Sequence, residues 1–184
     1  MLQPMTRGFV IEFSNQGQAA AVFQVRAPDL DTVPRSYTVE PGKRLTDSWG
    51  LANGGDYDLT VHGPHGFLRA FKGRLHDDER ALLEAHVECR HAGEQAVHLS
   101  VANFGQLPAR LRMRDNYTGD TWSGALSPDD VIQRQRSCAR HDGWYDLVIS
   151  SDEDGAFRWQ FAGHIENGRH SISAAALGWQ ALDA

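Results

Sequence analysis

Two histidines, His62 and His65, stand three positions apart in the stretch VHGPHGF (61–67). Imidazoles at this spacing can bind a metal ion when a tight turn brings their ring nitrogens together. The glycines and the proline around them are typical of a surface turn whose polar side chains face water. The sequence therefore favours a solvated loop. We predict no metal site here and keep His62 and His65 as candidate binding residues of that loop.

A second loop, SSDEDG (150–155), carries the three consecutive acids Asp152, Glu153 and Asp154. Carboxylates can gather a calcium ion, but the longer ligand spacing of a calcium loop is missing, so a solvated turn is favoured again. The chain contains no G-x-S-x-G, H-E-x-x-H, P-loop or C-x-x-C motif, the patterns that most often carry hydrolytic, metal or phosphate chemistry. We therefore predict no catalytic residue, no metal and no cofactor in this chain.

These two loops occupy the same place in an internal repeat. The stretch GGDYDLTVHGPHGFLRAFKGRL (54–75) returns as DGWYDLVISSDEDGAFRWQFAGHI (142–165), with Tyr57 matching Tyr145 at an offset of 88 positions. Upstream, Asn15 and Asn103 repeat at the same offset within N-x-G-Q, a signature of a β-hairpin turn. The copies share Gly, Tyr, Asp, Leu and Phe but not the histidines. The repeat thus indicates a duplicated fold rather than a duplicated site.

Short alternating stretches set the fold class. In YDLTV (57–61) and YDLVI (145–149) the apolar side chains recur at every second position, which is typical of half-buried strands. Turn clusters such as EPGK, NYTGD and SSDEDG punctuate the chain, a spacing typical of a sandwich or barrel. We predict an all-β fold of two tandem immunoglobulin-like antiparallel β-sandwich domains, residues 5–81 and residues 82–184. Residues 82–89 are predicted as the first strand of the second repeat, although DDERALLEA (77–85) also fits a helix, as does SAAALGWQALDA (173–184).

Each copy places a tyrosine, Tyr57 or Tyr145, two positions after a glycine and just inside a strand. This pattern resembles the tyrosine corner of immunoglobulin-like domains, in which the phenol hydroxyl bonds to backbone a few residues upstream. We therefore predict structural tyrosine corners at both positions.

The returning strand of each hairpin carries phenylalanines on one face, which we predict to be core. Trp159 lies between two of them, and its counterpart in the first copy is Arg69. Because an arginine seldom occupies a dry core, we predict that this column sits at an edge or an interface. An exposed Trp159 would be a candidate binding residue there. The predicted core phenylalanines are Phe67, Phe71, Phe157 and Phe161.

Composition narrows the partners and the compartment. The chain has 18 basic and 24 acidic residues, a net charge of −6 and no basic stripe interleaved with aromatics, so we predict no nucleic-acid partner. No apolar run is long enough to span a membrane, and MLQPMTRG (1–8) lacks the apolar core of a secretory signal. An exported protein would therefore have its export signal outside this chain. Cys89 and Cys138 are favoured as reduced thiols, and a single bridge in an oxidising compartment stays open.

The stretch SYTVEPGKRLTDSWGLANGGDYDLTVHGPHGFLRAFKG (36–73) resembles the C-terminal domain of bacterial phosphocholine-preferring phospholipases C. These are the haemolytic and non-haemolytic secreted enzymes, in which this domain usually occurs as a tandem pair. The resemblance covers nearly the whole chain, but the second copy is looser and loses the H-G-P loop. The residues that carry it are Y-T-V-x-P-G-K (37–43), Trp49, Y-D-L-x-V-H-G-P (57–64) and G-F-L-R-x-F-x-G (66–73).

This resemblance implies a non-catalytic accessory module. In that family the hydrolytic machinery lies in a large N-terminal phosphoesterase domain, and no segment here matches it. That domain would be the partner of the module in a secreted parent enzyme that hydrolyses phosphatidylcholine or sphingomyelin. A zwitterionic phospholipid membrane surface is a second implied partner, since a net charge of −6 offers no attraction to anionic lipid.

Two alternatives stay open: a free-standing carbohydrate- or protein-binding module, and a chain that itself hydrolyses phosphodiesters. One departure bears on the fold. The strand predicted at 82–89 has its first-copy equivalent before residue 1. Either the first copy lacks an edge strand, or MLQPM (1–5) takes its place.

Overall fold

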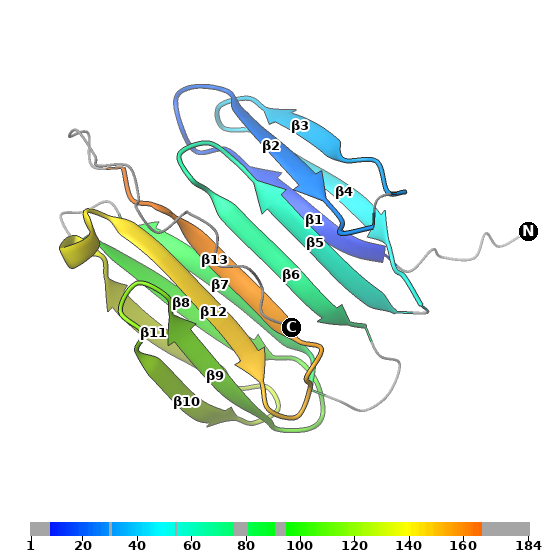
Figure 1. The fold of residues 1–184 in the computed structure, drawn as a ribbon, viewed down its shortest axis with the longest axis vertical. Coiled ribbons are helices and arrows are strands. Elements are labelled where there is room, and N and C mark those ends of the chain that lie inside the picture. The colour runs from blue at the N-terminus through cyan, green and yellow to red at the C-terminus, as the bar shows by residue number, and fades with distance from the viewer. Residues whose placement is uncertain (1–7, 30, 54, 76–80, 91–94, 167–184) are drawn as a thin grey trace, which may run out of the picture.

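The computed structural model describes residues 8–29, 31–53, 55–75, 81–90 and 95–166, and strands dominate these ranges (Figure 1). The prediction of an all-β fold is confirmed. No helix among the described residues is long and apolar enough to cross a membrane, and the segment 173–184 lies outside them. The strands are β1 (Gly8–Ser14), β2 (Ala21–Arg26), β3 (Arg35–Val39), β4 (Arg44–Gly50), β5 (Asp56–His62), β6 (Leu68–Arg74), β7 (Leu83–Arg90), β8 (Ala96–Asn103), β9 (Ala109–Asp115), β10 (Thr121–Leu126), β11 (Val131–Ser137), β12 (Trp144–Ser151) and β13 (Arg158–His164), with a single 3-10 turn at Ala139–His141.

Three antiparallel sheets form two layers. One layer is an eight-stranded sheet in the order β10-β9-β12-β13-β6-β5-β2-β3, and the other consists of the pair β1-β4 and the three strands β11-β8-β7. The large sheet runs without a break from the first half of the chain into the second, because β6 pairs with β13. The division into two domains at residue 81 therefore stays a prediction, since both halves contribute to one sheet.

The strand order repeats between the halves. Strands β1 to β6 correspond in sequence to β8 to β13, and β7 has no described counterpart in the first half. At the junction, Trp159 pairs with Phe71 and Phe161 pairs with Arg69. Phe71 and Phe161 occupy equivalent positions of the repeat, as do Arg69 and Trp159. The two halves are thus related by an approximate two-fold axis that passes between β6 and β13.

Each half encloses an apolar cluster between its two layers. Alternation places the apolar side chains of the strands on the inner faces, which is why short alternating segments suffice to build both layers. Leu59 and Leu147, the equivalent residues of β5 and β12, are both buried. The first cluster is formed by Ile11, Phe13, Phe23, Val25, Tyr37, Val39, Trp49, Leu59 and Val61. The second is centred on Val97, Leu99, Leu111, Leu126, Leu147 and Ile149.

A repeated asparagine organises the first hairpin of each half. Asn15 Oδ1 accepts a hydrogen bond from Gly17 N (2.9 Å), and its Nδ2 donates to the carbonyl of Val39 (2.8 Å). Asn103 makes the equivalent bonds, and its Oδ1 also accepts from Leu82 N (3.1 Å). Asparagine suits this place because one side chain can supply an acceptor and two donors to a turn.

Candidate interface groove at the junction of the two halves

Trp159 lies at the centre of the junction and is only 7% exposed. Its ring lies edge-on to Phe71, with centroids 5.0 Å apart, and 5.5 Å from the ring of Phe157. Its Nε1 donates a hydrogen bond to the hydroxyl of Tyr57 across the junction (3.2 Å). The structure places this column at an interface within the chain, as one branch of the prediction has it. An exposed Trp159 is contradicted, and its role as a binding residue stays a prediction.

Arg69, the counterpart of Trp159, crosses the junction in the opposite direction. Its guanidinium donates to the hydroxyl of Tyr145 (3.0 Å) and to the carbonyl of Ala162 (2.9 Å). It also lies over the ring of Phe67, 4.2 Å from the centroid. A charged group can leave water when its donors are satisfied and an aromatic face lies against it. These contacts explain how an arginine occupies a site that its equivalent fills with tryptophan.

The two repeated tyrosines join the halves. Trp159 donates to the Tyr57 hydroxyl and Arg69 donates to the Tyr145 hydroxyl, in each case from the other half of the chain. The Tyr145 hydroxyl also contacts the Cys89 thiol of its own half (3.8 Å). A tyrosine corner would require a bond to backbone upstream, so the partner differs from the predicted one. Gly73 and Gly163 leave room for the rings, because a Cβ at either position would lie within 3 Å of the hydroxyl oxygen of the tyrosine opposite.

Two buried phenols and one buried thiol make the stability of the fold fall at alkaline pH. Burial raises the pKa of Tyr57 to about 12, that of Tyr145 to about 12, and that of the Cys138 thiol to about 11, from ordinary values of 10.0 for tyrosine and 9.0 for cysteine. The folded protein therefore keeps protons that the unfolded chain releases. Their contribution to stability is complete below about pH 9 and is lost as the pH rises through the folded pKa values.

We expect the urea midpoint to stay level from neutral pH to about pH 8.5 and then to fall continuously. The variant Cys138→Ala should show a shallower decline between pH 9 and 11 than the unchanged chain, because one of the three groups is gone. A midpoint that stays level through pH 11 would contradict the assignment. Cys89 and Cys138 are both free thiols in the structure.

The two candidate histidines have different surroundings. His62 is exposed, and partial burial of its ring together with the nearby Arg26 lowers its pKa. His65 takes a left-handed conformation (φ 55°), and its Nδ1 lies 3.4 Å from Glu166 Oε1. His164 Nδ1 lies 3.0 Å from the same oxygen. The described residues contain no group of three His, Cys, Asp or Glu side chains arranged to hold a metal ion. The binding role of His62 and His65 stays a prediction.

The acidic loop is used for local structure. Glu153 Oε2 accepts hydrogen bonds from Arg110 N (2.6 Å) and from the Ser151 hydroxyl (3.2 Å). Asp152 accepts from Arg112 (3.1 Å). These contacts fasten the β12–β13 loop to β9, and the backbone bond from Arg110 lowers the pKa of Glu153.

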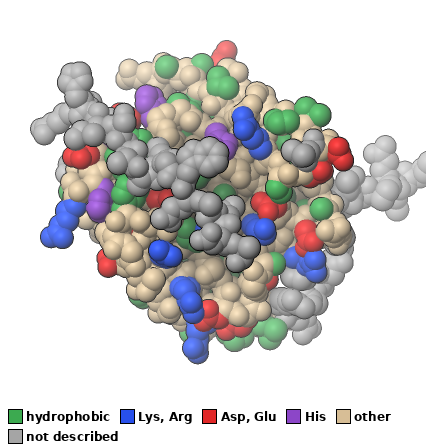
Figure 2. Space-filling model, viewed as in Figure 1, with side chains coloured by type: hydrophobic (Ala, Val, Ile, Leu, Met, Phe, Trp, Pro, Cys, Tyr) green, Lys and Arg blue, Asp and Glu red, His purple; other side chains and the backbone are tan. Residues whose placement is uncertain are grey.

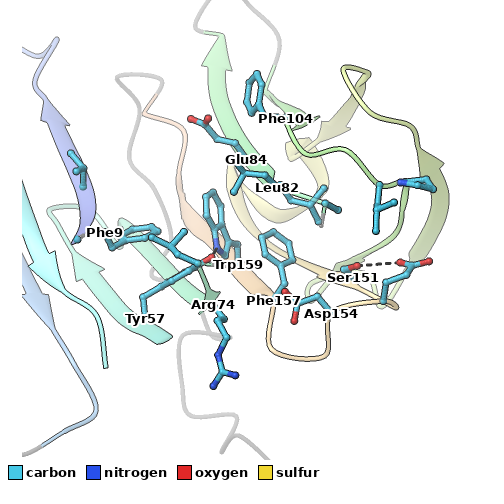
Figure 3. A pocket seen from close by; sticks show the side chains of 18 residues that line it. Phe9, Tyr57, Arg74, Leu82, Glu84, Phe104, Ser151, Asp154, Phe157 and Trp159 are labelled. Carbon is cyan, nitrogen blue, oxygen red and sulfur yellow. Dashed lines mark hydrogen bonds between the residues drawn. The ribbon is translucent and has the colours of Figure 1, made fainter. Parts of the chain in front are cut away.

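A groove of about 690 Å³ lies between β1 and β7, beside the junction (Figure 3). Tyr57, Phe157 and Trp159 are among its lining residues, and Figure 3 shows their rings between the two strands. Around it stand four large apolar side chains that face solvent: Val10 (62% exposed), Leu82 (51%), Phe104 (60%) and Leu107 (50%). Figure 2, which shows the face seen in Figure 1, has positive and negative side chains interspersed.

The lining of the groove does not provide the parts of a hydrolytic site. Two of its polar members have local partners: Arg74 pairs with Asp56 (2.8 Å), and Ser151 bonds to Glu153. Among the described lining residues there is no histidine, the side chain that most often serves as a general base. An apolar, half-open groove of this kind fits the side chains of another polypeptide segment. The sequence did not reveal it, because the exposure of Leu82 and Leu107 depends on neighbouring strands.

Comparison with known proteins finds one family and several relatives that match most of the chain. The family described as "Bacterial phospholipase C, C-terminal domain" matches residues 2–74 and 79–164. The chain is 34% identical over 174 residues to a non-hemolytic phospholipase C of Pseudomonas aeruginosa, covering 91% of this chain and 25% of that protein. It is 37% identical to a non-hemolytic phospholipase C of Burkholderia pseudomallei (91% and 24%) and 33% identical to a hemolytic phospholipase C of Pseudomonas aeruginosa (92% and 25%). The chain thus spans about a quarter of the length of these relatives.

Proposed function

This chain belongs to the family of bacterial phospholipase C C-terminal domains, and from that premise we propose that it packs as an accessory module against the catalytic part of such an enzyme. The match accounts for about a quarter of each relative, so we assign the phospholipase activity that their names state to the remaining part of those proteins. The parent is proposed to hydrolyse phosphocholine lipids, phosphatidylcholine or sphingomyelin, outside the cell.

The observation that carries the proposal is the ring of exposed apolar side chains around the groove. Isolated exposed apolar residues are ordinary, but a contiguous group beside a groove marks an interaction surface. Phe104 and Leu107 lie on the short loop between β8 and β9, on the rim of this groove. Aromatic and large aliphatic side chains are typical of the buried centre of a protein interface. Their burial by the catalytic part would remove this surface from water.

A lipid surface is a second candidate occupant, and the exposed side chains of Phe104 and Leu107 are the structural observation that supports it. Trp159 is buried and cannot insert into a membrane. Phe104 and Leu107 could enter the interface of a zwitterionic bilayer, where apolar burial and not charge would drive binding. Protein packing is favoured because the groove behind these residues has a volume of about 690 Å³, enough to accept side chains of a partner.

We expect the double variant Phe104→Asp/Leu107→Asp, in the polypeptide encoded by the complete reading frame, to separate the module from the catalytic part. Two thermal transitions should replace one, and protease should cut between the parts. Val33→Asp is the matched control, because Val33 is an exposed loop residue outside the groove.

In a second experiment, the 184-residue chain is sedimented with phosphatidylcholine vesicles. Unchanged unfolding of the double variant would refute packing through this groove, and co-sedimentation lost in the double variant would favour the lipid surface.

A further inference from the structure

We propose that the open edge of β1 is completed in the parent enzyme by a strand from the upstream part of the same polypeptide, inserted between β1 and β7. The inference rests on the proposed function and adds the mode of contact, which is strand addition. The partner is an extended segment with apolar residues at alternate positions, running antiparallel to both neighbouring strands.

The internal repeat supplies the first observation. In the second half β8 is a central strand, paired with β11 on one edge and β7 on the other. Its counterpart β1 is paired with β4 alone. Within the described residues, the second edge of β1 therefore presents backbone donors and acceptors without a neighbouring strand. Proteins seldom leave such an edge uncovered, because it pairs readily with any extended segment.

Side chains on the outer face of β1 are more exposed than their equivalents on β8, as expected when β1 has a neighbouring strand on one edge only. On the outer face of β8, His98 and Ser100 are half-buried between flanking strands. Their equivalents on β1, Val10 and Glu12, are exposed. A strand at the second edge of β1 would place side chains beside these positions, as β7 does for β8.

The repeated asparagine supplies a second observation. Asn103 Oδ1 accepts from Leu82 N, and Phe104 N donates to the carbonyl of Leu82 (2.8 Å), so the start of β7 is fastened at this turn. Asn15 and Gln16 stand at the equivalent places in the first half. Among the described residues, Asn15 Oδ1 and Gln16 N have no partner that corresponds to Leu82. The turn of the first half therefore has the same hydrogen-bonding groups that hold the start of β7 in the second half.

The groove lies where this strand belongs. The approximate two-fold axis relates β8 to β1, and applying it to β7 places a strand between β1 and β7. Phe9 from β1 and Leu83 from β7 both line the groove, as does Trp159. Figure 3 shows Phe9 and Trp159 on the wall of this groove. A strand occupies roughly 160 Å³ per residue at the usual rise, strand spacing and layer thickness. The 690 Å³ groove would hold roughly four residues at that figure, half of a strand as long as β7.

The order of the repeat points to an upstream donor. In the second half, β7 comes directly before β8 in the chain. A strand that corresponds to β7 in the first half would therefore come before β1. In the relatives the matched part is described as C-terminal and fills about a quarter of the protein. The donor is therefore assigned to the polypeptide that precedes this chain in its parent.

Hydrogen–deuterium exchange compares the complete polypeptide with the 184-residue chain. In the complete polypeptide, the β1 amides that face away from β4 should exchange slower by an order of magnitude or more, while the amides of β8 should be unchanged. Protection of these β1 amides already in the short chain would overturn the proposal, in favour of residues 1–7 or, if it depends on concentration, a second copy. Equal, fast exchange in both proteins would also overturn it.

A peptide probe keeps the test independent of the parent enzyme. The peptide ALLEAHVESR copies residues 81–90 with Cys89→Ser and should shift the β1 amide resonances of the 184-residue chain. The control peptide carries prolines at the positions of Leu83, Ala85 and Val87 and should not, because proline cannot donate to a ladder. Equal shifts with both peptides, or none with either, would count against an open edge.

One outcome separates strand insertion from the proposed function. If Phe104→Asp/Leu107→Asp loses packing while the exchange of the β1 amides is unchanged, the proposed function is retained and strand insertion is rejected.

Discussion

Replacing Trp159 with alanine is expected to lower the free energy of unfolding by about 3–5 kcal/mol, the usual cost of deleting a buried tryptophan. The ring is 7% exposed and lies between Phe9, Phe71 and Phe157. The deletion leaves a cavity under the strand pair that joins the halves, and it removes the donor to the Tyr57 hydroxyl. We expect the thermal midpoint to fall by roughly 10 °C, measured by circular dichroism.

Trp122→Ala is the matched control. Trp122 lies on β10, at the far end of the large sheet, and is half-buried under Arg134, whose guanidinium lies 4.2 Å from the ring centroid. Its loss should cost about 1–2 kcal/mol, since less apolar area is uncovered. Trp159→Phe separates packing from hydrogen bonding and should cost less than the alanine variant. Equal losses for Trp159→Ala and Trp122→Ala would show that the junction is not a principal source of stability.

Gly73→Ala is expected to lower the free energy of unfolding by about 1–3 kcal/mol through overpacking. A Cβ at this position would lie 2.3 Å from the Tyr57 hydroxyl oxygen and 2.6 Å from its Cζ. Tyr57 is buried and its ring is stacked on Phe9, with centroids 4.4 Å apart, so it has little room to withdraw. Gly163→Ala should cost less, because its Cβ would lie 2.9 Å from the Tyr145 hydroxyl.

The control for these variants is Gly50→Ala, where a Cβ would meet nothing within 4 Å. It should change stability by less than about 0.5 kcal/mol. In the background Tyr57→Leu, which removes the hydroxyl, Gly73→Ala should cost less than in the unchanged chain. Such coupling identifies direct contact as the cause. Urea unfolding measures all of these variants, and additive losses for Gly73→Ala and Tyr57→Leu would contradict the steric explanation.

The strands themselves were largely readable from the sequence. Alternation in YDLTV and YDLVI placed β5 and β12, and the strand predicted at 82–89 is β7, Leu83–Arg90. Phe157 and Phe161 are buried as predicted, whereas Phe67 and Phe71 are half-buried beside the junction. Period-two alternation is a local signal, which is why it survives without knowledge of neighbours.

The candidate site was less predictable. The Arg69 and Trp159 column was correctly suspected of lying at an interface, because arginine is poorly compatible with a dry core. The bonds from Trp159 to the Tyr57 hydroxyl and from Arg69 to the Tyr145 hydroxyl were not foreseen, since each donor belongs to the other half of the chain. The groove escaped notice because the exposure of Phe104 and Leu107 depends on which strands lie beside their loop.

The sequence alone determined the strand periodicity, the duplication and the family, because side-chain types at fixed spacing carry each of these. Only the tertiary structure decided that β6 and β13 join in one sheet and that, among the described strands, β1 pairs with β4 alone. Strand pairing uses backbone donors and acceptors that every residue except proline supplies. A sequence therefore indicates where strands run, while the choice of neighbours follows from how complete halves fit together.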